Sequence, residues 1–321
     1  MPIIKGRDAA MGVVERMRRR RVSMAIFCTA SHWNTEAILL AAKRYAEKKG
    51  IESIPLAVAM TFRYPHMQQA ERATFSRDAK AGFVSIMRHL QTLCGDDGSP
   101  YADVAVLPHL DHADPVRDGW ALTEGLPYLA SVMFDAQAYP EAENLQMTRD
   151  YVKTYGGQVL VEGIMEQLAV AGGPRARQSD LYVEKAVGYV RDTGIDFLVA
   201  DLGTEQQSAS AGGCTYLAER ARALTERLGR PMLVLHGTSS LTDGQMGSLA
   251  GDGVIRVNMW TRIARESGQH AAWRLCGRCE SIAAGLFEAT ESRQYLDDSV
   301  EKAAEIMERT LDLLGYGRLA E

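Results

Sequence analysis

The sequence predicts a (β/α)8 barrel of the TIM type, because short apolar runs and amphipathic segments alternate along its whole length. Eight apolar runs lack the polar alternation of half-exposed strands, which indicates parallel strands buried on both faces. They cover residues 23–28, 53–60, 104–110, 128–135, 158–164, 196–201, 232–237 and 254–260. Eight such units in roughly 250 residues suit a closed barrel better than an open, doubly wound sheet.

The segments between these runs have apolar residues recurring every three or four positions, which predicts helices. Four of them end in glycine, where we expect left-handed C-terminal caps, and they cover residues 34–50, 143–157, 181–194 and 214–229. A leading helix at about 8–20 and a helical tail at about 262–316 decorate the barrel. We expect one domain over residues 1–321, with its last helical extension at about 288–321.

The composition is that of a soluble globular protein, with 46% hydrophobic and 24% charged residues. A formal net charge of −5 argues against general binding to nucleic acid or to an anionic membrane. The start of the sequence has no signal-peptide core, and no stretch approaches the ~20 apolar residues of a membrane span. The five cysteines are too few and too scattered for a disulfide framework, so we expect a cytoplasmic protein.

The third apolar run leads directly into titratable residues. In "VAVLPHLDHADP" a buried strand runs into His109, Asp111, His112 and Asp114. We expect Asp114 to be a helix N-cap, with Pro115 at the first helical position. Asp111 and His112 are then the residues left for function.

Polar residues also end the other strands, and in this architecture the active site lies at the C-terminal ends of the strands. A single strand-end carboxylate is more often a cap or a turn residue, but burying many charges together is costly without a metal or a substrate. These strand-end residues are Asp111, His112, Asp135, Glu162, Glu166, Asp201, His236 and Asn258. Two histidines and a carboxylate at the mouth of a barrel predict a divalent metal site that includes His112 and His236.

The segments "HGTSS" and "NMWT" follow the seventh and eighth runs, where such barrels commonly bind phosphate through backbone N–H groups and hydroxyls. Gly237 would let the backbone approach an oxyanion, while Ser239, Ser240 and Thr261 offer donors. Helix N-capping explains these hydroxyl residues equally well when they are considered alone.

These motifs, in this order, resemble the class II, zinc-dependent fructose-bisphosphate and tagatose-bisphosphate aldolases. "HLDHA", "SVMFDAQAYPEAEN", "VLHGTSS" and "GVIRVNMWT" are similar to the family's motifs at strands three, four, seven and eight, and the likeness covers nearly the whole chain. The resemblance implies that Asp111 is the acid/base on the hydroxyl at the cleaved bond. It further implies metal ligands at His112 and His236, a substrate contact at Asn258, phosphate contacts at Gly237, Ser239 and Thr261, and a hydrogen bond within the site from Asp135.

Departures from the family pattern fall on the metal and phosphate sites. The family's strand-six motif G-T-x-H-G reads "GTEQQ" here, which places Gln206 at a zinc histidine and Gln207 at a phosphate-binding glycine. Glutamine is a poor zinc ligand, and Glu205 could replace the histidine if the loop shifts. Cys28 stands at the strand-one asparagine. Trp260 is unusually large for the strand-eight loop and either stacks on a substrate or simply packs.

The leading interpretation is a metal-assisted aldolase, a carbon–carbon lyase that cleaves or forms a hydroxy-ketone such as a sugar or sugar phosphate. Asp111 would take the proton from the hydroxyl β to the carbonyl, and a divalent ion, expected to be Zn²⁺, would act as Lewis acid on the ketone. The two histidines and Glu205 would hold that ion. The family's strand-five motif E-L-G is blurred to "VEGIME", so Glu162 or Glu166 would handle the proton at the enediolate carbon. No lysine ends any of the eight runs, which argues against a Schiff-base aldolase.

Two other interpretations stay open. A diverged enzyme could act on an unphosphorylated specialised metabolite, as the two glutamines at 206 and 207 suggest. A non-catalytic aldolase paralogue could serve as a partner subunit, although the retention of Asp111 and His112 weighs against it. In the leading interpretation the ligand is a ketose or ketose phosphate, and we expect a homodimer or homotetramer.

Overall fold

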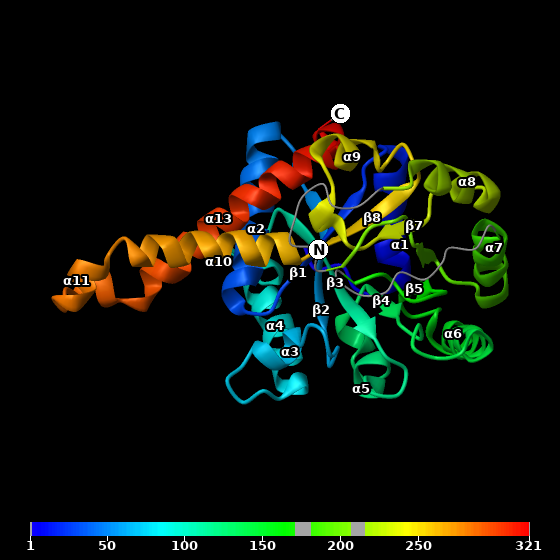
Figure 1. Cartoon of the computed structure of the whole chain (residues 1–321), viewed down its shortest axis with the longest axis horizontal. Coiled ribbons are helices and arrows are strands. Elements are labelled where there is room, and N and C mark those ends of the chain that lie inside the picture. Colours follow the sequence, from blue (N-terminus) through cyan, green and yellow to red (C-terminus); the bar gives the residue numbers. More distant parts are fainter. Residues whose placement is uncertain (1, 171–180, 207–215, 321) are drawn as a thin grey trace.

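The computed structural model of the chain describes residues 2–170, 181–206 and 216–320. Parallel strands pair in chain order and close into a barrel in which β1 lies next to β8 (Figure 1). The strands are β1 Met24–Cys28, β2 Ile54–Thr61, β3 Val104–Ala113, β4 Ser131–Phe134, β5 Leu160–Ile164, β6 Phe197–Val199, β7 Leu233–Leu235 and β8 Val254–Met259. The predicted (β/α)8 barrel is confirmed, and each strand overlaps the apolar run that predicts it.

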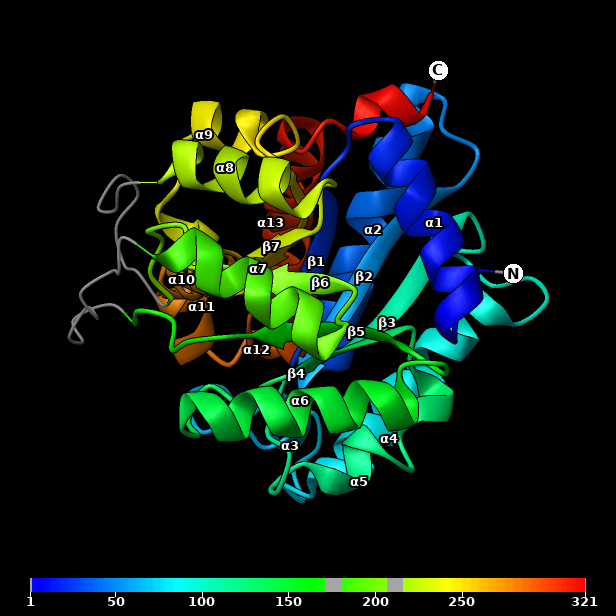
Figure 2. The ribbon, with the colours of Figure 1, turned by 90° about the vertical axis from the view of Figure 1, so that its right-hand side faces the viewer.

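Helices surround the barrel on its outside (Figures 1 and 2). The helices from the N-terminus to the seventh loop are α1 Arg7–Arg19, α2 His32–Lys49, α3 Gln69–Arg72, α4 Ala79–Leu90, α5 Gly119–Leu122, α6 Glu141–Tyr155, α7 Tyr182–Thr193, α8 Ala218–Leu228 and α9 Asp243–Ser248. The C-terminal helices are α10 Thr261–Cys276, α11 Cys279–Ala283, α12 Phe287–Thr290 and α13 Ser292–Leu313. Shorter turns are π-helical at Gln91–Gly95 and 3-10 at Leu126–Tyr128, Thr238–Ser240 and Tyr316–Leu319.

The C-terminal helices form a projection that extends well beyond the barrel (Figure 1). Helices α10 and α13 pack against each other, and α13 also packs against α2. Large apolar side chains are exposed on this projection, including Trp273 at 71% and Phe287 at 75%. Among the described residues, no helix combines the length and the apolar character that crossing a bilayer requires.

Two details of the predicted helix ends differ from the structure. Left-handed caps occur at Gly50, Gly194 and Gly229, but Gly156 after α6 has a right-handed φ of −60°. There the Arg7 guanidinium donates to the Gly156 carbonyl at 2.8 Å, so a side chain satisfies a carbonyl at the end of the helix.

The predicted cap at Asp114 is also wrong. Asp114 Oδ1 accepts from the N–H groups of Val116 and Arg117, at 2.9 and 2.8 Å, but these belong to a turn. The helix α5 begins only at Gly119, after Asp118. Asp118 Oδ2 accepts the Asp114 N–H at 2.9 Å, which closes this turn and delays the helix by several residues.

Candidate active site

Strand β3 departs from regular alternation where it carries Asp111 and His112. Consecutive side chains of a regular strand point to opposite faces, yet both of these line one pocket among the C-terminal ends of the strands. The pairing of β3 with β4 shifts between Leu110 and Ala113, and His112 has a φ of +46°. This irregularity lets two neighbouring residues line the same site. It places His112 in a left-handed backbone conformation that residues other than glycine rarely adopt.

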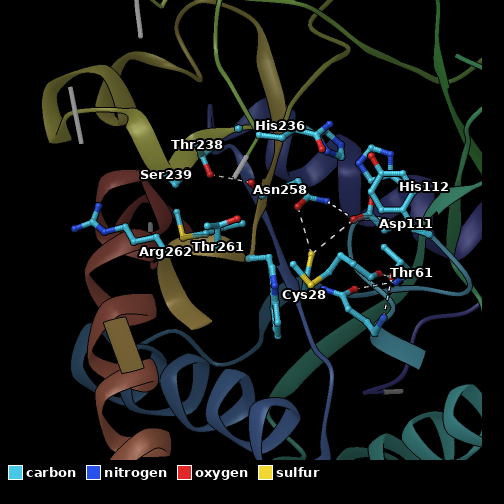
Figure 3. Close-up of a pocket in the computed structure, with 17 residues that line it drawn as sticks. Cys28, Thr61, Asp111, His112, His236, Thr238, Ser239, Asn258, Thr261 and Arg262 are labelled. Carbon is cyan, nitrogen blue, oxygen red and sulfur yellow. Dashed lines mark hydrogen bonds between the residues drawn. The ribbon is translucent and has the colours of Figure 1, made fainter. Parts of the chain in front are cut away.

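Asp111, His112 and His236 form the candidate metal group (Figure 3). All three are buried, and each offers one ligand atom within 4.8 Å of the others. The two imidazole centroids lie 4.9 Å apart with the rings at 75°. Within the described part of the chain, His236 Nε2 and Asp111 Oδ1 are buried and bond no neighbour. Because buried polar atoms without partners are costly, this donor set fits a divalent cation.

The Nδ1 contact of His112 and the pKa of His236 both suit metal binding. His112 Nδ1 lies 2.7 Å from Asp135 Oδ2, so Nε2 is the ring nitrogen that could bind a metal. Burial lowers the pKa of His112, but the carboxylates of Asp111 and Asp135 raise it overall. Burial lowers the pKa of His236 to about 4, so this imidazole is neutral at pH 7, as a ligand must be.

Asp111 is held through one of its two oxygens. Asn258 Nδ2 donates to Asp111 Oδ2 at 3.0 Å, and Cys28 Sγ lies 3.3 Å from Asn258 Oδ1 and 3.8 Å from Asp111 Oδ2 (Figure 3). Burial raises the pKa of the Cys28 thiol, which therefore stays protonated and donates. Burial also acts to raise the pKa of Asp111, but the histidines His112 and His236 lower it overall. Asp111 is thus an ionised carboxylate with one anchored and one free oxygen.

Hydroxyl and backbone groups line the β7 and β8 side of the same pocket, where Gly237, Ser239 and Thr261 lie. Gly237 has a φ of +71°, and a Cβ on it would lie 2.7 Å from the backbone carbonyl of Glu205, so the loop requires glycine. Ser239 Oγ is buried and bonds no described neighbour. Thr238 Oγ1 donates to the Asn258 carbonyl at 2.9 Å and ties the two loops together.

Glu162 lies in the barrel interior and does not line the pocket. Its Oε1 is 2.5 Å from Arg256 Nη1, and its Oε2 is 3.7 Å from His109 Nε2. Ser131 Oγ bonds both His109 Nδ1, at 2.8 Å, and Arg256 Nη2, at 3.1 Å. Since His109 comes two residues before Asp111 on β3, this buried group forms the layer beneath the pocket. Burial raises the pKa of Glu162 to about 7 despite the attraction of Arg256.

Two other predicted carboxylates, Glu166 and Glu205, are not part of the candidate metal group. Neither Glu166 nor Glu205 is among the described residues that line the pocket, whereas Gln206 is. Burial raises the pKa of Glu166, the charge of Asp201 raises it further, and the charge of Arg220 acts to lower it. The third member of the metal group in the structure is Asp111 rather than Glu205. Gln207, expected at a phosphate-binding position, is outside the described residues.

The pocket also contains residues that the sequence analysis did not identify. Thr61, Tyr64 and Gln69 belong to β2 and the segment after it, and they line the pocket beside Asp111 and His112. Their position after the C-terminal end of a strand is the one signal that would have indicated them. The charged layer beneath the pocket had a signal as well, because Glu162 and Arg256 are single charges inside apolar runs.

Comparison with known proteins identifies the family. The sequence model of the family described as fructose-bisphosphate aldolase class-II matches residues 10–317. The chain belongs to this family. Its predicted resemblance is thereby confirmed, and so is its assignment as an aldolase, a carbon–carbon lyase. The family depends on a divalent metal, for which the group formed by Asp111, His112 and His236 is the candidate site.

Individual relatives are similar at low sequence identity. A 6-phospho-5-dehydro-2-deoxy-D-gluconate aldolase from Shouchella clausii is 27% identical over 246 residues, which cover 76% of this chain and 78% of the relative. A fructose-bisphosphate aldolase from Streptococcus pneumoniae is 28% identical over 221 residues, which cover 66% and 72%. The crystal structure of fructose-bisphosphate aldolase from Campylobacter jejuni has a TM-score of 0.73 at 16% identity, covering 97% of this chain and 95% of that one. This last likeness supports the fold.

Proposed function

We propose that the protein is a Zn²⁺-dependent aldolase that cleaves or forms a hydroxy-ketone, a sugar or a sugar phosphate, with Asp111 as the acid/base. The observation that carries this proposal is the buried His236 Nε2, which bonds no described neighbour and lies with the His112 imidazole beside the equally unpartnered Asp111 Oδ1. A divalent ion held by the two histidines would supply Lewis-acid stabilisation of the charge that develops at the substrate carbonyl, which leaves Asp111 Oδ1 to act as the base.

The residues of the chain account for the proton transfers. In the cleavage direction Asp111 accepts the proton of the hydroxyl β to the carbonyl through Oδ1, while Asn258 holds Oδ2. The carbon–carbon bond then breaks, which releases an aldehyde and leaves its electron pair on the carbon next to the carbonyl. A proton must return to that carbon. Of the two predicted carboxyls, Glu162 has a pKa of about 7, but it lies in the layer beneath the pocket and would reach that carbon only through an intervening group.

The β7 and β8 side of the pocket supports a phosphorylated substrate. Ser239 Oγ is free to donate, Gly237 allows close approach to its backbone, and Thr261 adds a hydroxyl. The Shouchella clausii relative is named for a phosphorylated sugar acid. Gln206 lines the pocket at the position of a family zinc histidine, so it bears on the metal site, and the second candidate, an unphosphorylated substrate, is decided by the substrate assay.

The test combines metal analysis with cleavage assays. The purified protein is analysed for zinc, dialysed against a chelator and assayed for aldehyde release from ketose 1-phosphates and from the same ketoses without phosphate. We expect activity to disappear on dialysis, to return with Zn²⁺, and to favour the phosphorylated series. Asp111→Asn should lower kcat by roughly 10²- to 10⁴-fold. Asp114→Asn, at the turn outside the pocket, is the matched control.

Each outcome bears on one part of the proposal. Unchanged cleavage by metal-free protein would refute the metal dependence. Equal turnover of the two substrate series would refute the phosphate assignment. An Asp111→Asn variant as active as Asp114→Asn would remove the acid/base assignment.

We also propose a homodimer or homotetramer. Exposed aromatic side chains such as Trp273 and Phe287 on the projecting helices support an interface there. Sedimentation should give a multiple of the 35.3 kDa chain mass. A monomer at micromolar concentration would refute this part of the proposal.

A further inference from the structure

We propose that Tyr64 is a positioning residue of the metal centre, which holds the His112 imidazole in the plane that its ligand nitrogen requires. The inference rests on the proposed function, because it takes Asp111, His112 and His236 as the metal group. It assigns a role to a residue between β2 and α3, outside the strand-end motifs.

The Tyr64 ring lies flat on the His112 ring. Their centroids are 4.3 Å apart and the ring planes differ by 8°. His236 approaches His112 at 75°, with its centroid 4.9 Å away. The imidazole is therefore covered by one aromatic ring in parallel and contacted by another nearly at right angles. Both arrangements are favourable for ring pairs.

His112 needs this second constraint. Its bond from Nδ1 to Asp135 Oδ2, at 2.7 Å, fixes one point of the ring but leaves rotation about that point. The backbone of His112 is in the left-handed region, with φ at +46°, so local geometry does not place the side chain in the way a regular strand would. The Tyr64 ring removes the remaining rotation and keeps Nε2 directed at the group.

The segment that carries Tyr64 is itself held in place. The Met67 N–H donates to the Tyr64 carbonyl at 3.1 Å, which closes a turn. Thr61 and Gln69 bond each other twice across the ends of the segment, from the Thr61 N–H to Gln69 Oε1 at 2.9 Å and from the Gln69 N–H to Thr61 Oγ1 at 3.1 Å. A ring on a segment anchored in this way can restrain its neighbour, whereas a ring on a free loop could not.

The hydroxyl of Tyr64 is separable from this role. Burial and the charges of Asp135 and Asp111 raise the pKa of Tyr64, so its hydroxyl is un-ionised at neutral pH. The stacking depends on the ring alone, so phenylalanine at position 64 should retain it and leucine should not. The worth of an aromatic pair corresponds to roughly a three- to ten-fold change in an equilibrium constant.

The experiment measures metal binding directly. Full-length wild type, Tyr64→Phe, Tyr64→Leu and Tyr64→Met are stripped of metal, checked for folding by circular dichroism and titrated with Zn²⁺ by calorimetry. Their Co²⁺ forms are compared by visible absorption, which reports ligand geometry without turnover. Phe75→Leu is the matched control, because Phe75 is fully exposed on the loop between α3 and α4.

We expect Zn²⁺ affinity to fall roughly three- to ten-fold in Tyr64→Leu and Tyr64→Met, with a changed Co²⁺ spectrum, and to stay within two-fold in Tyr64→Phe and Phe75→Leu. If one aliphatic variant fails to fold, the other decides. Wild-type affinity and spectrum in a folded aliphatic variant would overturn this inference alone. A wild-type protein that binds no divalent metal would overturn the proposed metal centre itself.

Discussion

Replacing Gly237 with alanine tests whether the loop after β7 is shaped by backbone packing. Gly237 has a φ of +71°, and an added Cβ would lie 2.7 Å from the carbonyl carbon and oxygen of Glu205 and 2.9 Å from its nitrogen. Gly229 has nearly the same φ, +72°, but nothing lies within 4 Å of an added Cβ. Gly229→Ala is therefore a control that shares the conformational cost and lacks the contact.

The two costs can be estimated separately. An alanine in the left-handed region costs about 1–2 kcal/mol at either position. At Gly237 backbone atoms must also move by several tenths of an ångström, which adds about 1–3 kcal/mol as in other overpacked sites. With an unfolding entropy of about 2.1 cal/mol/K per residue, 1 kcal/mol corresponds to about 1.5 °C in this chain. We expect the Tm to fall by about 2 °C in Gly229→Ala and by about 3–7 °C in Gly237→Ala.

The assay is thermal unfolding of both variants without metal, followed by cleavage assays after Zn²⁺ has been restored. Movement of Glu205 displaces the adjacent Gln206, which lines the pocket, so Gly237→Ala should also lose activity, by up to about 10²-fold. Gly229→Ala should keep full activity. Equal Tm values for the two variants would refute the idea that contact with Glu205 determines the loop.

Two further predictions concern buried groups of the site. Glu162 has a raised pKa of about 7, so between its ordinary pKa and pH 7 the folded state binds more protons than the unfolded state, and the free energy of unfolding falls as the pH rises. In urea unfolding of the metal-free proteins, Glu162→Gln should lack the decrease in stability between pH 5 and 7 that the wild type shows. The same pH profile in both proteins would contradict this prediction. Cys28→Ala removes the thiol donor beside Asn258 and should lower kcat/KM about ten-fold. Cys28→Ser keeps a donor, so its kcat/KM should stay closer to that of the wild type. Equal losses in the two variants would show that the thiol acts only by filling space.

The fold could be predicted because the signals for a barrel are local and repeated. Parallel strands covered on both faces appear as continuous apolar runs, and helices between them keep their own periodicity. The helix ends were harder to predict from the sequence, since the end of α6 depends on Arg7, which is far away in the sequence. A glycine after a helix predicts a left-handed cap only when no distant side chain satisfies the carbonyl first.

The site residues at the C-terminal ends of strands could be predicted from the sequence, and those at other places much less well. Asp111, His112 and His236 could be grouped because barrel topology brings these ends together. Glu162 also belongs to a strand. Whether its side chain reaches the pocket or the layer below depends on its depth in the barrel, which the amino-acid sequence does not give. Tyr64 acts through the face of its ring, and its contact with His112 follows from the path of a loop that has no periodic signal.

The shift in pairing at His112 has a consequence for anyone who would rebuild this centre. If the side chains of this site were placed on a regular strand, the side chain of residue 112 would face the surrounding helices instead of the barrel interior. The reason is that consecutive side chains of a regular strand point to opposite faces. The site therefore depends on the backbone conformation of β3 as well as on its side chains. A designed version would need the shift in strand pairing together with the histidine.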